Sequence, residues 1–238
     1  MSHTRRFYRS YSGTRGFNFN VKADTTDLFI TSDRDLSADA YRILAARRQE
    51  IEEHISSCRE FLYSLSPLEA CYGSPPIVLD MYRASAAAGV GPMAAVAGAV
   101  AEYVGRGLLE LTDEVIVENG GDIWLKLKTS AILGIYVNSI YFRDRIRLKI
   151  NPENTPCAVC TSSASLGHSL SFGKADAATI VAESGALSDA VATGACNLVQ
   201  SEDDLQRAVD YAMSVNGVSG CLIIYRDKFA ACGEIELC

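Results

Sequence analysis

The stretch EVIVENGGDIWLKLK, residues 114–128, places an Asn-Gly-Gly turn between two segments in which apolar and polar residues alternate. Such alternation is typical of half-buried strands, and Asn-Gly between two of them is the strongest short signal of a β-hairpin. We therefore predict strands at Glu114–Glu118 and Asp122–Lys128, joined by a turn at residues 119–121. Segments on either side of this hairpin decide the fold class.

Further strand patterns flank the central hairpin. The expected strands are one or two within Phe17–Ser32, then Ala131–Val137, Arg145–Ile150, one ending near Cys160, and Ala177–Ala182, followed by a terminal hairpin of Gly220–Tyr225 and Phe229–Ile235. Apolar residues at helical spacing predict four helices between these strands. The first helix begins at Ser37 as its cap and runs to Ser66-Pro67, and the second begins at Gly91-Pro92. The third covers Leu187–Val199, and the fourth covers Glu202–Val215 with Ser201 as its cap.

Mixed helices and antiparallel hairpins predict the α+β class. Residues 1–238 show no linker and no fixed-period repeat, so we expect one domain, alone or built from two interlocked subdomains. On the first helix, His54 lies on the charged face, and we expect it at the surface.

Composition limits the function classes. Hydrophobic residues make up 48% and charged residues 21% of the chain, as in folded soluble proteins, and the net charge of −7 disfavours nucleic acid as a partner. The arm at residues 1–16 interleaves arginines with aromatic residues and predicts either an anion contact or a solvated arm. No apolar stretch follows these arginines and no long span is sustained, so we expect no secretory signal, no membrane partner and a cytoplasmic location.

Eight cysteines at irregular spacing fit reduced, buried thiols rather than a disulfide framework. The pair Cys157 and Cys160 has C-x-x-C spacing, which without a second such pair is weak evidence for zinc or redox chemistry. We interpret the two as small residues on either face of a buried strand.

Three short segments and one helix carry groups that suit ligand binding. Glycine amides before a helix favour anions, a glycine-rich turn with Asn and Asp lets a ligand approach backbone, and clustered hydroxyls suit phosphate or ribose oxygens. The candidate residues are Gly89 and Gly91, then Asn119, Gly120, Gly121 and Asp122, then Thr161, Ser162 and Ser163. Close packing, a plain turn and a solvated loop are the alternatives. The small residues 94–99 likewise allow close approach by another backbone or a ligand.

Asp189 and Thr193 are four residues apart within an apolar helix, so their oxygens share one helical face. Carboxylate and hydroxyl oxygens suit a hard cation such as Mg²⁺. The alternative is that Asp189 only complements the dipole of the helix N-terminus.

Taken in order, GGDI at 120–123, TSS at 161–163 and SDAVAT at 188–193 resemble the ApbE-like family of FAD:protein FMN transferases. The similarity covers about residues 77–199. The runs GVGPMAAVAG at 89–98 and GKAD at 173–176 resemble, more closely, a cytoplasmic and uncharacterised branch of that family. The resemblance implies a T-fold-like architecture.

The resemblance also implies roles for the candidate residues. Asp189 and Thr193 become magnesium ligands, completed in the family by a backbone carbonyl from the segment corresponding to residues 89–92. The segments 119–122 and 161–163 would line a pocket for FAD. The implied reaction moves FMN from FAD to a hydroxyl of an acceptor protein, with release of AMP.

Departures from the family pattern leave other functions open. Residues 91–96 read GPMAAV where the family carries a Lys-Gly-Tyr-Ala-x-Asp type segment, the His-x-x-Asp-Pro segment is absent around His168, and Ser163 replaces a glycine. We therefore retain two alternatives. The chain could bind a nucleotide, flavin or anionic metabolite without turning it over, or act as an assembly partner whose small-residue helix forms a homo-oligomer interface.

Overall fold

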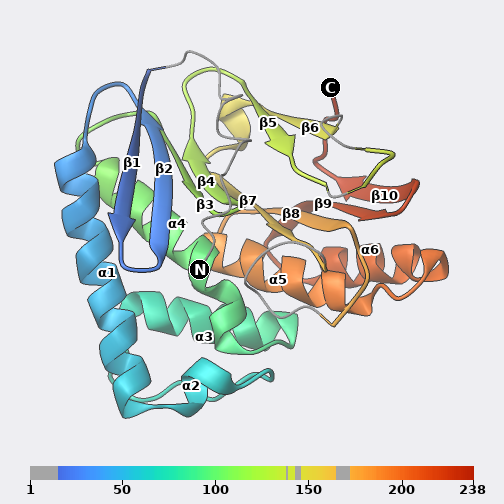
Figure 1. Ribbon diagram of the computed structural model, residues 1–238, viewed down its shortest axis with the longest axis horizontal. Coiled ribbons are helices and arrows are strands. Elements are labelled where there is room, and N and C mark those ends of the chain that lie inside the picture. Colours follow the sequence, from blue (N-terminus) through green and yellow to red (C-terminus); the bar gives the residue numbers. More distant parts are fainter. Residues whose placement is uncertain (1–15, 138, 143–145, 165–171) are drawn as a thin grey trace.

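A computed structural model describes residues 16–137, 139–142, 146–164 and 172–238. Within this part of the chain, an eight-stranded antiparallel sheet carries helices on one face and a two-stranded sheet on the other (Figure 1). The predicted α+β class is thereby confirmed. Residues 1–15 of the Arg-rich arm and His168 lie outside the described residues.

The large sheet follows the chain order except where β5 and β6 leave it. In spatial order its strands are β1 (Phe17–Ala23), β2 (Thr26–Ser32), β3 (Val115–Asn119), β4 (Asp122–Lys126), β7 (Cys157–Ser162), β8 (Ala177–Ala182), β9 (Val218–Tyr225) and β10 (Lys228–Gly233). β5 (Ala131–Ile135) and β6 (Ile146–Ile150) form the small sheet. The predicted central hairpin is present, with Asn119 paired to Asp122 at its tip.

Six α-helices and three 3-10 turns connect these strands in the described chain. They are α1 (Ser37–Ser57), α2 (Glu60–Tyr63), α3 (Pro76–Ala88), η2 (Pro92–Ala95), α4 (Val96–Leu108), η3 (Pro152–Asn154), α5 (Gly185–Leu198), η4 (Glu202–Asp204) and α6 (Leu205–Ser214). Two predicted starts are confirmed. Pro92 opens the turn that continues into α4, and Ser201 forms a capping box with Asp204 before α6.

The large sheet separates two hydrophobic cores. One lies between the sheet and the helices, and the other lies between the sheet and β5–β6. Because side chains alternate along a strand, β7 contributes to both: Cys157 belongs to the core under β5–β6 and Cys160 to the helical core. This confirms the interpretation of the C-x-x-C pair as residues on opposite faces of a buried strand.

The first helix differs from the prediction at both ends. Ser37 is its first residue and not its cap, because the side chain of Asp35 accepts the Ser37 N–H at 2.9 Å. The helix ends at Ser57 rather than near Ser66, because the backbone of Cys58, with φ −131° and ψ 81°, leaves the helical conformation before α2. The surface position predicted for His54 is wrong: α2 and α3 cover this end of α1, and only 7% of the residue is exposed.

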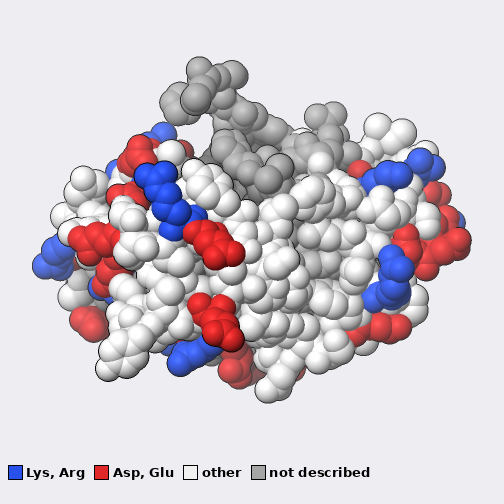
Figure 2. Space-filling model, turned by 90° about the horizontal axis from the view of Figure 1, so that it is seen from below, with Lys and Arg blue, Asp and Glu red and all other residues white. Residues whose placement is uncertain are grey.

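Charged side chains are interspersed on the face seen in Figure 2, with wide uncharged areas between them. Among the described residues, no single helix is long and apolar enough to cross a membrane. Only α3 together with residues Pro92–Leu108 reaches the required length and hydropathy, and these two helices are bent by 106° relative to each other.

Candidate functional site

The tip of the β3–β4 hairpin is fixed by its glycines and by contacts with α4. Gly120 and Gly121 have φ values of +78° and +153°, which side chains disfavour, so glycine is required for the turn. The Gly120 N–H donates to Glu118 Oε1 at 3.1 Å, and Asn119 Nδ2 donates to the Ala97 carbonyl at 3.1 Å. The tip is therefore held against the start of α4.

Asp122 links this tip to β7. Its Oδ1 accepts the Thr161 N–H at 3.3 Å, and the hydroxyl of Thr161 bonds that of Thr179 on β8 at 2.9 Å. Two of the predicted segments, residues 119–122 and 161–163, are thus neighbours in space, as the hypothesis of a shared pocket requires.

Asp189 reaches the same region from α5. Its Oδ2 accepts the Gly98 N–H at 2.9 Å, and only 7% of the residue is exposed. Thr193, one turn further along α5, is 5% exposed. The hydrogen bonds from Asn119 to the Ala97 carbonyl and from the Gly98 N–H to Asp189 place the hairpin tip and Asp189 at the two ends of one peptide unit, Ala97–Gly98, in α4.

Burial is the main influence on both carboxyl groups, and the charge of Asp122 also acts on Asp189. Asp122 keeps some exposed surface at the tip, but protein atoms crowd its carboxyl group, and this burial raises its pKa to about 7, with a smaller increase from the charge of Glu118. Burial raises the pKa of Asp189 well above its usual value, and the charge of Asp122 raises it further. A bound divalent cation would offset the repulsion between two such carboxylates.

This linkage makes stability depend on pH. The folded protein holds a proton on Asp122 up to about pH 7, whereas the unfolded chain releases that proton near pH 4. This contribution to the free energy of unfolding is therefore complete below about pH 4 and is lost as the pH rises to about 7. We expect Asp122→Asn, which carries no charge, to flatten this decline. Urea unfolding of both proteins across this pH window measures the effect, and identical slopes would contradict the assigned burial.

The helices α4 and α5 cross at two glycines. A Cβ on Gly98 would clash with the Gly185 carbonyl, and a Cβ on Gly185 would clash with the Gly98 carbonyl. The predicted close approach at residues 94–99 is therefore confirmed as contact with another backbone. It also brings the Gly98 amide within reach of Asp189.

Glu102 holds the N-terminus of α5 in place. Its buried Oε2 accepts the Gly185 N–H at 2.7 Å and the Ser184 hydroxyl at 3.1 Å, while Oε1 pairs with Arg106 at 2.6 Å. The carboxylate accepts one of the amide hydrogens at the start of the helix, that of Gly185, and its negative charge matches the helix dipole. These contacts explain why α5 begins at Gly185, two residues before the predicted start.

Glu102→Ala would leave the amide of Gly185 buried without its charged partner. We expect a loss of about 3 kcal/mol in the free energy of unfolding, because hydrogen bonds to buried charged groups contribute about 1.5–3 kcal/mol each. Urea unfolding measures the loss. Glu110→Ala, at an exposed glutamate after α4, is the matched control and should change stability by less than about 0.5 kcal/mol.

The remaining predicted residues lie close by in different roles. Gly89 ends α3 with φ +68°, and open space lies where its Cβ would be. Gly91 is buried, and the Ser64 carbonyl fills the place of its Cβ. Gly89 and Gly91 both precede η2. The amide that binds Asp189 is that of Gly98, which follows η2. Ser162 and Ser163 are buried at the end of β7.

Sequence reasoning missed Gly98 as a partner of Asp189, and it missed Glu102 and Gly185 entirely. A weak signal existed for the first, since Gly98 lies in the run of small residues. The pairing of Glu102 with Gly185 had no local signal.

The antiparallel sheet covered by helices is the fold of the ApbE flavin transferases. The flavin transferase ApbE from Vibrio cholerae shares this fold with a TM-score of 0.61 at 13% identity, covering 91% of this chain and 96% of that one. The flavinyl transferase ApbE of Pseudomonas stutzeri gives a TM-score of 0.54 at 12% identity, covering 91% of this chain and 94% of that one.

A family model described as AbpE bacteria matches residues 9–219, and the chain belongs to this ApbE-like family. A UPF0280 protein of Methanocaldococcus jannaschii is 36% identical over 217 residues, covering 89% of this chain and 88% of that protein. One from Methanopyrus kandleri is 36% identical over 225 residues, covering 92% and 91%. The resemblance inferred from the three motifs is confirmed.

Proposed function

We propose that the chain binds FAD or a similar dinucleotide together with Mg²⁺ between the hairpin tip and α5, and transfers FMN to an acceptor hydroxyl. The observation that carries this proposal is that Asn119 of the hairpin tip and Asp189 of α5 bind the two ends of the Ala97–Gly98 peptide unit, so that the carboxyl groups of Asp189 and Asp122 belong to one region. With Thr193 they offer only oxygen donors, which is the donor set that Mg²⁺ prefers. The residues present therefore fit the cation.

Each group has a distinct task in this proposal. Asp189 and Thr193 would hold the cation, and Asp122 adds a second negative charge from the hairpin tip. The Gly98 N–H fixes the Asp189 carboxylate, and Gly120 and Gly121, which carry no side chains, would let the dinucleotide approach the backbone of the tip. When bound, the cation offsets negative charge that develops on the pyrophosphate.

The reaction has a simple balance. The acceptor hydroxyl oxygen forms a bond to the phosphorus on the FMN side, the pyrophosphate P–O bond breaks, AMP leaves, and the hydroxyl proton passes to solvent. The acceptor is a protein in the family, which makes an acceptor protein the expected partner here.

A second candidate, binding without turnover, is favoured by the segment at residues 91–96. Pro92 and Ala95 are buried there, η2 packs against α5, and the segment contains no charged residue. A lysine or aspartate that could contact the dinucleotide from this position is therefore missing.

Incubation with FAD, Mg²⁺ and candidate acceptor proteins, followed by chromatography of released AMP, separates the two functions. Transfer predicts AMP release that a chelator stops. Binding without turnover predicts retained FAD in native mass spectra and no AMP. Protein that neither retains FAD nor releases AMP would contradict both.

A further inference from the structure

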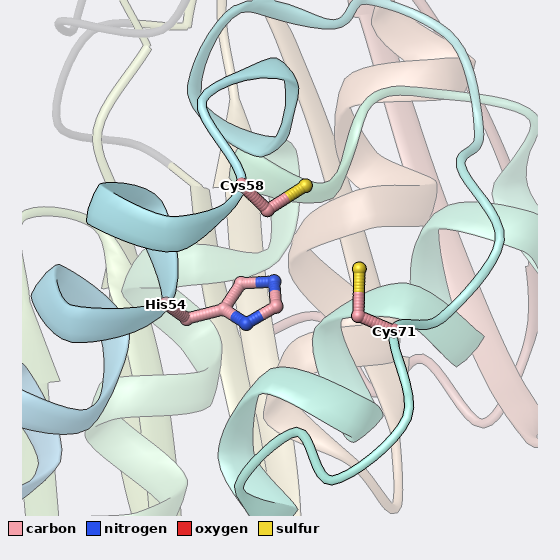
Figure 3. A group of neighbouring side chains, drawn as sticks. All are labelled: His54, Cys58 and Cys71. Atoms are coloured by element: carbon pink, nitrogen blue, oxygen red, sulfur yellow. The ribbon is translucent and has the colours of Figure 1, made fainter.

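Three side chains of the kind that bind transition metals converge away from the carboxylate site. His54 and Cys58 come from the end of α1, and Cys71 comes from the segment between α2 and α3. One ligand atom from each lies within 4.8 Å of the others. In Figure 3 the imidazole ring and both sulfur atoms point toward one common space.

The local sequence explains two of the three positions. His54 and Cys58 are four residues apart, so they share one face of the helix. The Cys58 N–H donates to the His54 carbonyl at 2.8 Å and closes the last turn, and the chain then leaves the helix because the φ and ψ of Cys58 are not helical. The helix end thus presents a nitrogen and a sulfur ligand together.

Tyr82 on α3 supplies a fourth polar atom. Its hydroxyl lies 2.9 Å from His54 Nε2, 3.7 Å from Cys71 Sγ and 3.9 Å from Cys58 Sγ. In tetrahedral zinc sites, Zn–S bonds of about 2.3 Å and Zn–N or Zn–O bonds of about 2.0–2.2 Å separate neighbouring donors by about 3.3–3.8 Å. The two distances from Tyr82 to sulfur match this spacing, whereas the 2.9 Å contact with His54 is a hydrogen bond about 0.4 Å shorter than it, so the His54 and Tyr82 atoms would move slightly apart around an ion.

The surroundings hold the ligands in the required orientation. The Phe61 ring packs edge-on against those of His54 and Tyr82, with centroids 4.8 and 4.9 Å apart, and so fixes both rings. Cys71 is exposed, which gives an ion access from solvent.

We propose that His54, Cys58 and Cys71 bind one Zn²⁺ ion, with the Tyr82 oxygen at the fourth position. Two thiolates and an imidazole form a donor set that suits zinc better than the hard cation expected at Asp189. Binding releases the two thiol protons to solvent, and no oxidant or reductant is needed.

A zinc ion here would join α1, α3 and the segment at residues 64–75. That segment begins at Ser64, whose carbonyl packs on Gly91 at the start of η2. The metal would therefore act as a structural clip beside the region that leads into α4, and its presence does not depend on the proposed transfer reaction.

Titration of the reduced, metal-free full chain with Co²⁺ and then Zn²⁺ tests the proposal. We expect one equivalent of Co²⁺ to give thiolate charge-transfer bands and the visible bands of a tetrahedral ion, and Zn²⁺ to displace it. Cys58→Ser and Cys71→Ser should each remove about half of the charge-transfer intensity. Competition with a chromogenic chelator should show zinc affinity reduced by at least about 100-fold, beyond the loss typical of an outer-shell partner.

Cys232→Ser, at an exposed cysteine on β10, is the matched control and should bind zinc like the original protein. Circular dichroism of each metal-free variant checks that it is folded, and the exposed position of Cys71 makes Cys71→Ser the variant least dependent on packing. Absence of thiolate bands, or undiminished zinc affinity in both Cys58→Ser and Cys71→Ser, would overturn the proposal.

Discussion

Asp189→Asn is expected to lower magnesium-dependent turnover of FAD by about 100-fold or more, because loss of one electrostatic contact to the developing charge costs about 10²–10³ in rate. The asparagine oxygen can still accept the Gly98 N–H, so the fold retains this hydrogen bond. What the variant loses is the negative charge that would hold the cation. AMP release at saturating FAD, measured over a range of Mg²⁺ concentrations, reports the effect.

Asp189→Ala separates charge from structure. This variant also leaves the Gly98 amide without its buried partner, and we expect a further loss of about 1–3 kcal/mol in the free energy of unfolding. Equal activity of the original protein and both variants would remove Asp189 from the site. If the protein binds without turnover, retention of FAD in the presence of Mg²⁺ should follow the same order.

Gly98→Ala is expected to give the largest loss of stability, about 3 kcal/mol or more in the free energy of unfolding. The added Cβ would clash with the Gly185 carbonyl and lie 2.8 Å from Asp189 Cβ, so α4 and α5 must move apart. Backbone atoms cannot yield as a flexible side chain does, which places this change at the upper end of overpacking costs. The same movement draws the Gly98 amide away from Asp189.

Gly134→Ala is the matched control, because nothing lies within 4 Å of the Cβ that it would add. Its stability in urea should stay within about 0.5 kcal/mol of the original protein. If Gly98→Ala proves as stable as this control, α4 and α5 do not cross as closely as described.

Local signals explain what the sequence could predict. The turn at residues 119–121, the proline at residue 92 and the Ser201 cap depend on neighbours in the chain, and each predicted structure is present. Contacts between distant segments were harder. Gly98 and Asp189 are 91 residues apart, and Glu102 and Gly185 are 83 apart, so no local pattern indicates that they meet.

His54 illustrates the same limit in the opposite direction. Its charged neighbours on α1 indicate a solvated face, and only the packing of Phe61 and Tyr82 from later segments buries it. The ApbE-like motifs, by contrast, carried information about distant contacts, because their order along the chain reflects a site that the fold assembles.

Calorimetric titration of FAD into the original protein and into Asp189→Asn, each with Mg²⁺ and with a chelator, tests the central claim most directly. We predict FAD binding by the original protein that requires Mg²⁺ and that is lost or strongly weakened in the variant. FAD binding of equal strength in all four titrations would contradict a magnesium site at Asp189.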